Sequence, residues 1–148
     1  MTAKDDPADD GRIQAIAAAQ PPFAKLMGVK VIEASRDKVV AEIVVREELT
    51  NRNGVLHGGA VMGLADNLGG TASFLNLPAG ATTSTIESKT NFFAACALGE
   101  KIQTETTPLH RGRSTMVWQT RITRADGKLA AIVTQTQIVL PAKARPSG

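Results

Sequence analysis

The spacing of apolar residues in the first third of the chain changes from a helical to an alternating period. An Ala-rich stretch runs up to Pro21-Pro22, and the helix it predicts ends there because proline cannot continue a helix. After Gly28 the apolar residues alternate with polar ones, which is typical of half-buried strands. The predicted elements are a helix at 12–20, a helical turn at 23–27, and strands at 29–32 and 39–45 joined near Arg36-Asp37. The acidic, polar residues 1–11 are expected to form a loose arm.

A longer helical pattern follows a loop at 47–56 that is rich in Asn and Gly. Apolar residues recur there at three- and four-residue steps, which predicts a helix over 58–75 that ends before Pro78. These apolar positions are Val61, Leu64, Ala65, Leu68, Ala72 and Leu75. The same stretch holds Gly59, Gly63, Gly69 and Gly70, although each glycine costs a helix about 1 kcal/mol relative to alanine. So many glycines indicate that something packs tightly against this helix.

The rest of the chain has the pattern of consecutive strands. They are predicted at 82–94, 100–109, 114–124 and 129–140, with a hairpin turn at Ala125-Asp126-Gly127-Lys128. Trp118 falls on the apolar face of its strand and is expected in the core. Strands joined by short turns pair in an antiparallel manner. The order of elements predicts an α+β fold, in which one curved antiparallel sheet wraps around one long central helix.

Length and composition describe one globular domain. The chain has 148 residues, 43% hydrophobic and 21% charged, so a mostly disordered or fibrous chain is excluded. We expect an arm and short helix at 1–22, the domain proper at 23–140 and a disordered tail at 141–148. The net charge of +3 and the 3% of aromatic residues argue weakly for phosphate-bearing small ligands and against nucleic acid.

The single cysteine, Cys96, excludes an intramolecular disulfide and favours a reducing compartment. The first ten residues contain four Asp and no apolar segment, so a signal peptide is not expected. No apolar run approaches the roughly 20 residues of a membrane span. The expected location is cytoplasmic, without membrane association.

One set of motifs is recognisable as a whole. Asn51-Arg52-Asn53-Gly54-Val55-Leu56-His57-Gly58-Gly59-Ala60 is followed by Leu64-Ala65-Asp66, then by Thr85-Ile86-Glu87, Asn91-Phe92-Phe93 and His110-Arg111-Gly112-Arg113. The combination resembles the phenylacetyl-CoA thioesterase-like branch of the hotdog superfamily over about residues 23–140. The resemblance implies a hotdog fold and hydrolysis of acyl-CoA thioesters to free acid and CoA. It also implies that no metal or cofactor takes part, apart from the CoA carried by the substrate.

The resemblance assigns catalytic roles at five positions. Asp66 is the general base or nucleophile, the His57-Gly58 step polarises the thioester carbonyl, and Asn51 holds the carbonyl or the attacking water. Thr85 lies near the carboxylate and is a candidate to hold water. Each position also has a simpler interpretation: a solvated Asp, a backbone-bonded His, a turn Asn or an ordinary strand Thr. Independently of the family, the N–H of Gly58 at a helix start suits a developing oxyanion, although a glycine there also permits a tight turn.

Five further residues are candidates for substrate binding. Met62, Phe92 and Phe93 are expected to line the acyl pocket. Arg111 and Arg113 are expected in a loop, where guanidinium groups match the phosphates of CoA, although solvated charge is the simpler explanation. Cys96 has no paired His, so a catalytic thiol is not expected.

The family resemblance and helix geometry both predict an oligomer. Gly58 and Asp66 are eight residues apart, roughly 12 Å along one helix with a net rotation of about 80°. One chain can hardly place both groups on one carbonyl. Two central helices packed antiparallel across a two-fold axis would build two shared sites, so we expect at least a homodimer and a dimer of dimers, a homotetramer.

Two rival functions stay open. A hotdog dehydratase or hydratase also uses a His and an acidic residue, usually Glu. A non-catalytic acyl-CoA-binding sensor would carry a helix-turn-helix ahead of the domain, for which the roughly 28 preceding residues leave too little room. Neither alternative, nor the resemblance, identifies the acyl group.

Overall fold

The elements of the computed structural model, which describes residues 7–143, follow the predicted order. They are α1 (Pro7–Ala18), α2 (Pro22–Met27), β1 (Lys30–Ala34), β2 (Val39–Val44), a 3-10 turn (Glu47–Leu49), α3 (Gly58–Phe74), β3 (Thr82–Phe92), β4 (Lys101–Arg111), β5 (Thr115–Thr123) and β6 (Leu129–Leu140). The strands form one antiparallel sheet in the order β1-β2-β4-β5-β6-β3. The predicted α+β architecture is therefore confirmed.

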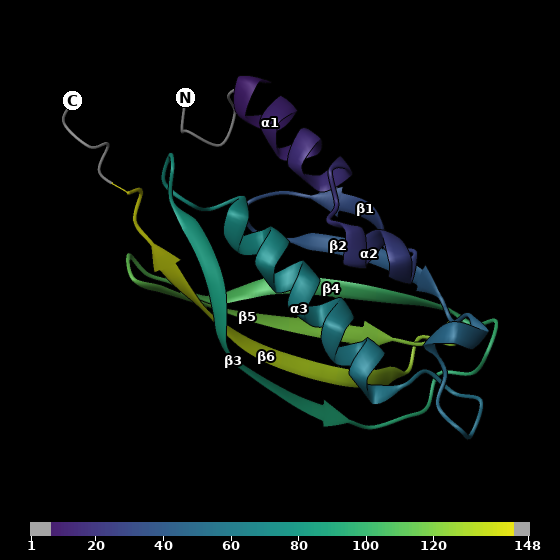
Figure 1. The fold of residues 1–148 in the computed structure, drawn as a ribbon. Coiled ribbons are helices and arrows are strands. Elements are labelled where there is room, and N and C mark those ends of the chain that lie inside the picture. Colours follow the sequence, from purple (N-terminus) through teal and green to yellow (C-terminus); the bar gives the residue numbers. More distant parts are fainter. Residues whose placement is uncertain (1–6, 144–148) are drawn as a thin grey trace.

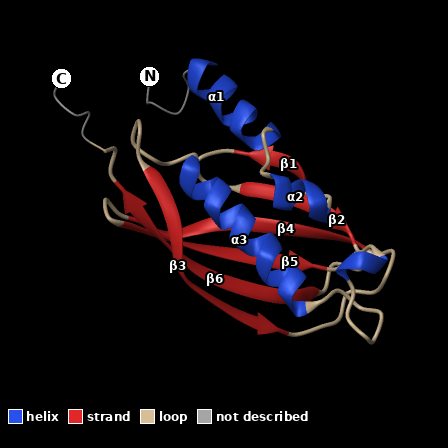
Figure 2. Cartoon of the chain, in the orientation of Figure 1, coloured by secondary structure: helices blue, strands red, loops and turns tan. Residues whose placement is uncertain are grey.

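The helices all lie on one side of the curved sheet (Figure 1, Figure 2). α3 crosses the middle of this face, while α1 and α2 lie over the β1–β2 end. β3 is an edge strand, although it packs along its whole length on β6. Asp66 of α3 faces the β6–β3 end of the sheet, where it contacts Thr85 of β3 and Gln135 of β6.

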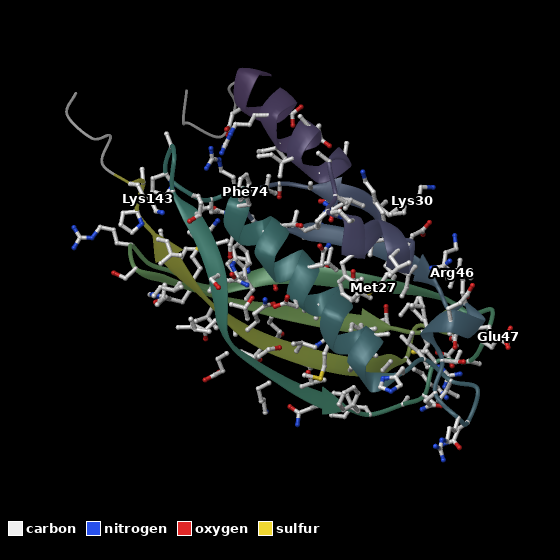
Figure 3. The ribbon with its side chains drawn as sticks, in the orientation of Figure 1. Met27, Lys30, Arg46, Glu47, Phe74 and Lys143 are labelled. Carbon is white, nitrogen blue, oxygen red and sulfur yellow. The ribbon has the colours of Figure 1, made fainter. Side chains whose placement is uncertain are left out.

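The core forms between α3 and the sheet. All six apolar positions predicted for the buried face of the helix are buried: Val61, Leu64, Ala65, Leu68, Ala72 and Leu75. Trp118 of β5 is fully buried, as predicted, and its indole Nε1 donates a hydrogen bond of 2.7 Å to Ser73 Oγ of α3. Met27 of α2 fills the space between α2 and α3 (Figure 3).

The prediction of a loose arm over residues 1–11 is wrong for its second half, since α1 begins at Pro7 rather than at residue 12. Proline is tolerated in the first turn of a helix, and Asp9 and Asp10 complement the helix dipole there. Asp9 also pairs with Arg36, with 2.7 Å between Oδ1 and Nη2, which fixes the start of the helix to the β1–β2 connection. Residues 1–6 of the predicted arm lie outside the described residues.

β4 is longer than predicted and reaches Arg111 instead of ending at 109. Pro108 lacks an N–H for the ladder, and the register shifts between Pro108 and His110. This bulge absorbs the proline, so pairing with β5 resumes and includes His110 and Arg111. The prediction that Arg111 lies in a loop is therefore wrong, whereas Arg113 does lie in the connection to β5.

Two other expectations concern the ends of the chain and the membrane. Most of the tail predicted at 141–148 lies outside the described residues. Within residues 7–143, no helix is both long and apolar enough to cross a membrane.

Candidate active site

Asp66 lies in the middle of α3, at the border of its buried face. Leu64, Ala65 and Leu68 pack into the core, whereas Asp66 is exposed. Its Oδ1 accepts two hydrogen bonds, one of 2.7 Å from Thr85 Oγ1 of β3 and one of 2.8 Å from Gln135 Nε2 of β6. In the described part of the chain, Oδ2 has no hydrogen-bond partner. The carboxylate is therefore held by one oxygen and leaves the other available.

A cavity of about 500 Å³ opens beside Asp66 and Thr85. Phe74, at the C-terminal end of α3 (Figure 3), contributes to its largely apolar lining. A second wall comes from the N-terminal segment. The lining residues from that segment are Ile16, Ala19, Gln20 and Pro21. Gln20 also fastens this wall to α3, because its Oε1 accepts a hydrogen bond of 2.8 Å from Asn67 Nδ2.

His57 is the N-cap of α3. Its Nδ1 accepts a hydrogen bond of 2.8 Å from the N–H of Gly59, so the proton of the neutral ring is on Nε2. The N–H of Gly58 has no acceptor among residues 7–143. An unpaired N–H at the positive end of a helix dipole can donate to a developing oxyanion.

Asn51 lies close to this helix start and braces its own loop. Its Oδ1 accepts hydrogen bonds from the N–H groups of Asn53, at 2.9 Å, and Val55, at 3.4 Å. The turn role that the sequence left open is therefore real. The side-chain amide nitrogen of Asn51 has no partner within the described residues, so binding of a carbonyl or water by this group stays a prediction.

A second cavity, of about 360 Å³, brings Asn51 and Gly58 together with Phe92 and Phe93. The ring of Phe92 lies over Gly58, where an added Cβ would meet its Cζ at 3.3 Å. Met62 is 39% exposed and lines neither cavity, whereas Phe92 and Phe93 remain 54% and 58% exposed. The three residues predicted to form one acyl pocket therefore do not come together in one chain.

Arg111 and Arg113 differ in their surroundings. Nη1 of Arg111 donates hydrogen bonds of 2.8 Å to Asp37 Oδ1 and 3.0 Å to the carbonyl oxygen of Arg36. Arg111 thus ties the end of β4 to the β1–β2 turn. Arg113 is exposed and has no ion-pair partner within the described residues.

Cys96 lines the second cavity but is buried. Burial, with a smaller contribution from the charge of Glu100, raises the pKa of the Cys96 thiol above its ordinary value. A thiol that stays protonated is a poor nucleophile, which agrees with the expectation that it is not catalytic. Among residues 7–143, no three His, Cys, Asp or Glu side chains gather as metal ligands.

Two buried residues of β6 were not predicted as site residues: Gln135, which contacts Asp66, and Gln137, which contacts Thr85. Both glutamines belong to the hydrophilic segment Thr134-Gln135-Thr136-Gln137 of the strand predicted at 129–140, to which no site role is assigned. A signal was present, because Ala131 and Val133 are followed at the same two-residue step by 135 and 137. The pattern therefore placed both glutamines on the inward face of the sheet.

Comparison with known proteins identifies the family and the fold. The model of the thioesterase superfamily matches residues 53–131, more than half of the chain. Human acyl-coenzyme A thioesterase 13 is 32% identical over 111 residues, 74% of this chain and 79% of that protein. The structure of a mutant thioesterase PA1618 from Pseudomonas aeruginosa is similar, with a TM-score of 0.81 and 27% identity over 87% of this chain and 94% of that one.

The E. coli PaaI protein, from the phenylacetic acid degradation operon, has the same fold. Its TM-score is 0.82 at 18% identity, covering 92% of this chain and 96% of that one. The six-stranded antiparallel sheet around one long helix is thus the hotdog architecture of these proteins. The chain belongs to the thioesterase superfamily and is a thioester hydrolase of the hotdog fold.

Proposed function

We propose that the chain hydrolyses acyl-CoA thioesters to the free acid and CoA. The observation that carries the proposal is the state of Asp66, with Oδ1 held by two donors and Oδ2 unpartnered beside a largely apolar cavity. A fixed carboxylate with one available oxygen suits either a general base or a nucleophile. The human relative is named an acyl-coenzyme A thioesterase, which supports CoA as the thiol.

As a general base, Asp66 takes a proton from water while the water oxygen bonds to the thioester carbon. The carbonyl oxygen becomes an oxyanion and accepts a hydrogen bond from the Gly58 N–H of a second chain. When the oxyanion collapses, the C–S bond breaks, the thiolate of CoA takes up a proton, and the acid is released. As a nucleophile, Asp66 would instead form an anhydride that water then hydrolyses.

The cavity beside Asp66 is the proposed acyl pocket. Its volume of about 500 Å³ and its lining by Ile16, Ala19 and Phe74 suit an aryl or medium aliphatic group. We assign the phosphates of CoA to Arg113 in the first place, because Arg111 is already paired with Asp37. No metal or cofactor is part of the proposal.

The test of this function measures thiol release from a panel of acyl-CoA esters. Asp66→Asn is expected to lower kcat by about 10²–10⁴, the contribution of a general base, without loss of folding. Asp126→Asn, in the hairpin turn, is the matched control and should leave kcat unchanged. Near wild-type hydrolysis by folded D66N would show that Asp66 is not the catalytic carboxylate.

The same assay separates the rival functions. A dehydratase or hydratase would change the absorbance of an enoyl-CoA without releasing thiol. A sensor would bind acyl-CoA and release no thiol. Either result with the wild-type protein, together with no hydrolysis across the panel, would overturn the proposal.

A further inference from the structure

Two buried amides of β6 have no part in the proposed proton transfer or in the proposed oxyanion contact. The side chains of Gln135 and Gln137 are each 1% exposed and lie beneath α3. Burial of an amide is costly unless its groups are hydrogen-bonded, and an apolar residue would fill this inward face without that cost. The partners of the two amides therefore indicate what they do.

Gln135 bonds directly to the catalytic carboxylate. Its Nε2 donates to Asp66 Oδ1 at 2.8 Å, lies 3.3 Å from the carbonyl oxygen of Asp66 and lies 3.1 Å from Thr85 Oγ1. The amide nitrogen must face Asp66, because a flipped amide would place Oε1 beside two other acceptors, the carboxylate and the carbonyl oxygen of Asp66. Gln135 is thus a donor to Asp66.

Gly69 makes room for this amide. A Cβ at position 69 would overlap Oε1 of Gln135, so any side chain there would displace the amide. Oε1 itself has no hydrogen-bond donor in the described part of the chain. The fit of Gln135 beside Asp66 therefore depends on a glycine one turn further along α3.

Gln137 acts one step further away, through Thr85, its direct cross-strand partner. Gln137 Nε2 donates to Thr85 Oγ1 at 2.7 Å, and Gln137 Oε1 accepts from Thr83 Oγ1 at 2.9 Å. Because the Thr85 oxygen accepts from both amides, its one hydrogen is directed to Asp66 Oδ1. The β3 ladder shifts register between Thr85 and Glu87, and such bulges re-aim the side chains beside them.

We propose that Gln135 and Gln137 are positioning residues for hydrolysis. Gln135 and Thr85 fill the acceptor sites of Asp66 Oδ1, and Gln137 directs the Thr85 hydroxyl to it. The carboxylate is thereby fixed, and Oδ2 remains as the oxygen that takes the proton or attacks. The Thr85 hydroxyl is fully used in this arrangement, so it orients Asp66 and has no lone pair for the water that it was predicted to hold. The inference rests on the proposed function of Asp66.

The first experiment replaces each glutamine by methionine, which has nearly the same shape and no donor. Gln135→Met is expected to lower kcat about 10- to 100-fold, the effect of losing a hydrogen bond to a charged group. KM should change much less, because Gln135 lines neither cavity. Thr120→Val is the matched control: it removes a buried 2.8 Å hydrogen bond to Thr106 in the same sheet and should alter neither constant.

The second experiment tests the path through Thr85. In a Thr85→Val background, Gln137→Met should cause no further loss of kcat, since Gln137 reaches Asp66 only through that hydroxyl. A change in KM is a separate effect, because Gln137 also lines the cavity beside Asp66. Gln135→Met should still cause a loss in this background, because it bonds Asp66 itself. An additive effect of Gln137→Met would overturn the relay.

Gly69→Ala provides a second approach if Gln135→Met does not fold. It keeps the glutamine but displaces its amide, so the same loss of kcat at similar KM is expected. The inference is overturned if D66N is inactive while the folded glutamine variant, or Gly69→Ala, keeps wild-type kcat, or if Thr120→Val loses as much. Near wild-type activity of D66N would instead remove the proposed function itself.

Discussion

At the scale of single residues, His57 stabilises α3 with the same imidazole that the family resemblance assigns to catalysis. Its Nδ1 caps the N–H of Gly59, which leaves the neighbouring N–H of Gly58 unpaired. His57 thus satisfies the N–H of Gly59 and leaves that of Gly58 for the proposed oxyanion. Asn51 behaves in a similar way, since its oxygen braces the loop while its amide nitrogen stays available among the described residues.

The cap can be tested through stability. His57→Ala should lower the free energy of unfolding by about 0.5–2 kcal/mol, the usual cost of removing an N-cap acceptor. His57→Ser should restore most of this loss, because serine is a preferred N-cap. Urea denaturation of both variants measures the difference, and equal stability of His57→Ala and the wild type would show that the cap contributes nothing.

Binding of the CoA phosphates by Arg113 can also be tested with a single substitution. Arg113→Ala should raise KM for acyl-CoA more than it lowers kcat, since phosphates remote from the reacting carbon are bound equally in ground and transition states. Arg121→Ala, an equivalent charge loss at an exposed position of β5, is the control and should leave KM unchanged. Esters of a short thiol without the nucleotide should be hydrolysed equally by all three proteins. Equal damage to both substrate types would refute the phosphate role.

At the scale of elements, the glycines of α3 allow close contacts within the chain. Gly63 accommodates the ring of Phe23, whose Cε1 would lie 2.9 Å from an added Cβ, and Gly69 accommodates Gln135. The expectation that something packs tightly on this helix is confirmed. The space beside these two glycines is filled by side chains of α2 and β6 of the same chain, whereas a Cβ added at Gly70 would meet no atom within 4 Å.

Glu100 joins two connections, from β3 to β4 and from β5 to β6. Hydrogen bonding to the N–H of Ala97 is the largest cause that lowers the pKa of this carboxyl, followed by the N–H of Ala125 and Arg124. A carboxyl whose pKa is lower in the folded state than in the unfolded state stabilises the fold while it is ionised. This contribution to stability is fully present above the unfolded-state pKa and is lost as the pH falls through the folded-state pKa.

Glu100→Gln should therefore be less stable than the wild type at pH 7. The difference in Tm should shrink as pH falls below the ordinary Glu pKa of about 4.3, because the wild-type carboxyl then also becomes neutral. Thermal denaturation of both proteins across this range measures the effect. A difference that is constant from pH 7 to acid would show that ionisation of Glu100 does not contribute.

At the scale of the whole molecule, one chain divides the proposed catalytic groups between two cavities. Gly58 and Asn51 line one, and Asp66 and Thr85 line the other. The edge strand β3 and the residue after it also leave Ile86, Phe92 and Phe93 largely exposed. Both features support a dimer in which Gly58 of one chain serves Asp66 of the other.

Mixing two inactive variants tests this arrangement. Gly58→Pro removes the N–H at the first helical position, where proline is tolerated, and His57 already has the extended conformation that precedes proline, with ψ 136°. Mixed dimers of D66N and G58P each regain one intact site, so random exchange should restore up to about a quarter of wild-type activity. Gly58→Ala keeps the N–H and is the control for bulk against Phe92. No recovery despite proven exchange would exclude the shared site.

The sequence by itself determined the order of elements, the buried face of α3 and the hairpin turn, because periodicity and turn chemistry are local properties. Through the family resemblance it also predicted that Thr85 lies near the Asp66 carboxylate, and the two side chains are hydrogen-bonded. The predicted element boundaries near Pro7 and Pro108 were less accurate, because tertiary contacts outweighed the local signals. An ion pair fixes the helix that begins at Pro7, and a bulge lets β4 continue past Pro108.

Only the tertiary structure decided which residues surround Asp66. Gln135 is 69 positions away in sequence, and Ile16 approaches the same cavity from the opposite end of the chain. Sheet register and the docking of α1 set these contacts, and both follow from packing between distant segments rather than from any local pattern. The hydrophilic appearance of 134–137 therefore concealed two amides that burial beneath α3 turns into donors to Thr85 and Asp66.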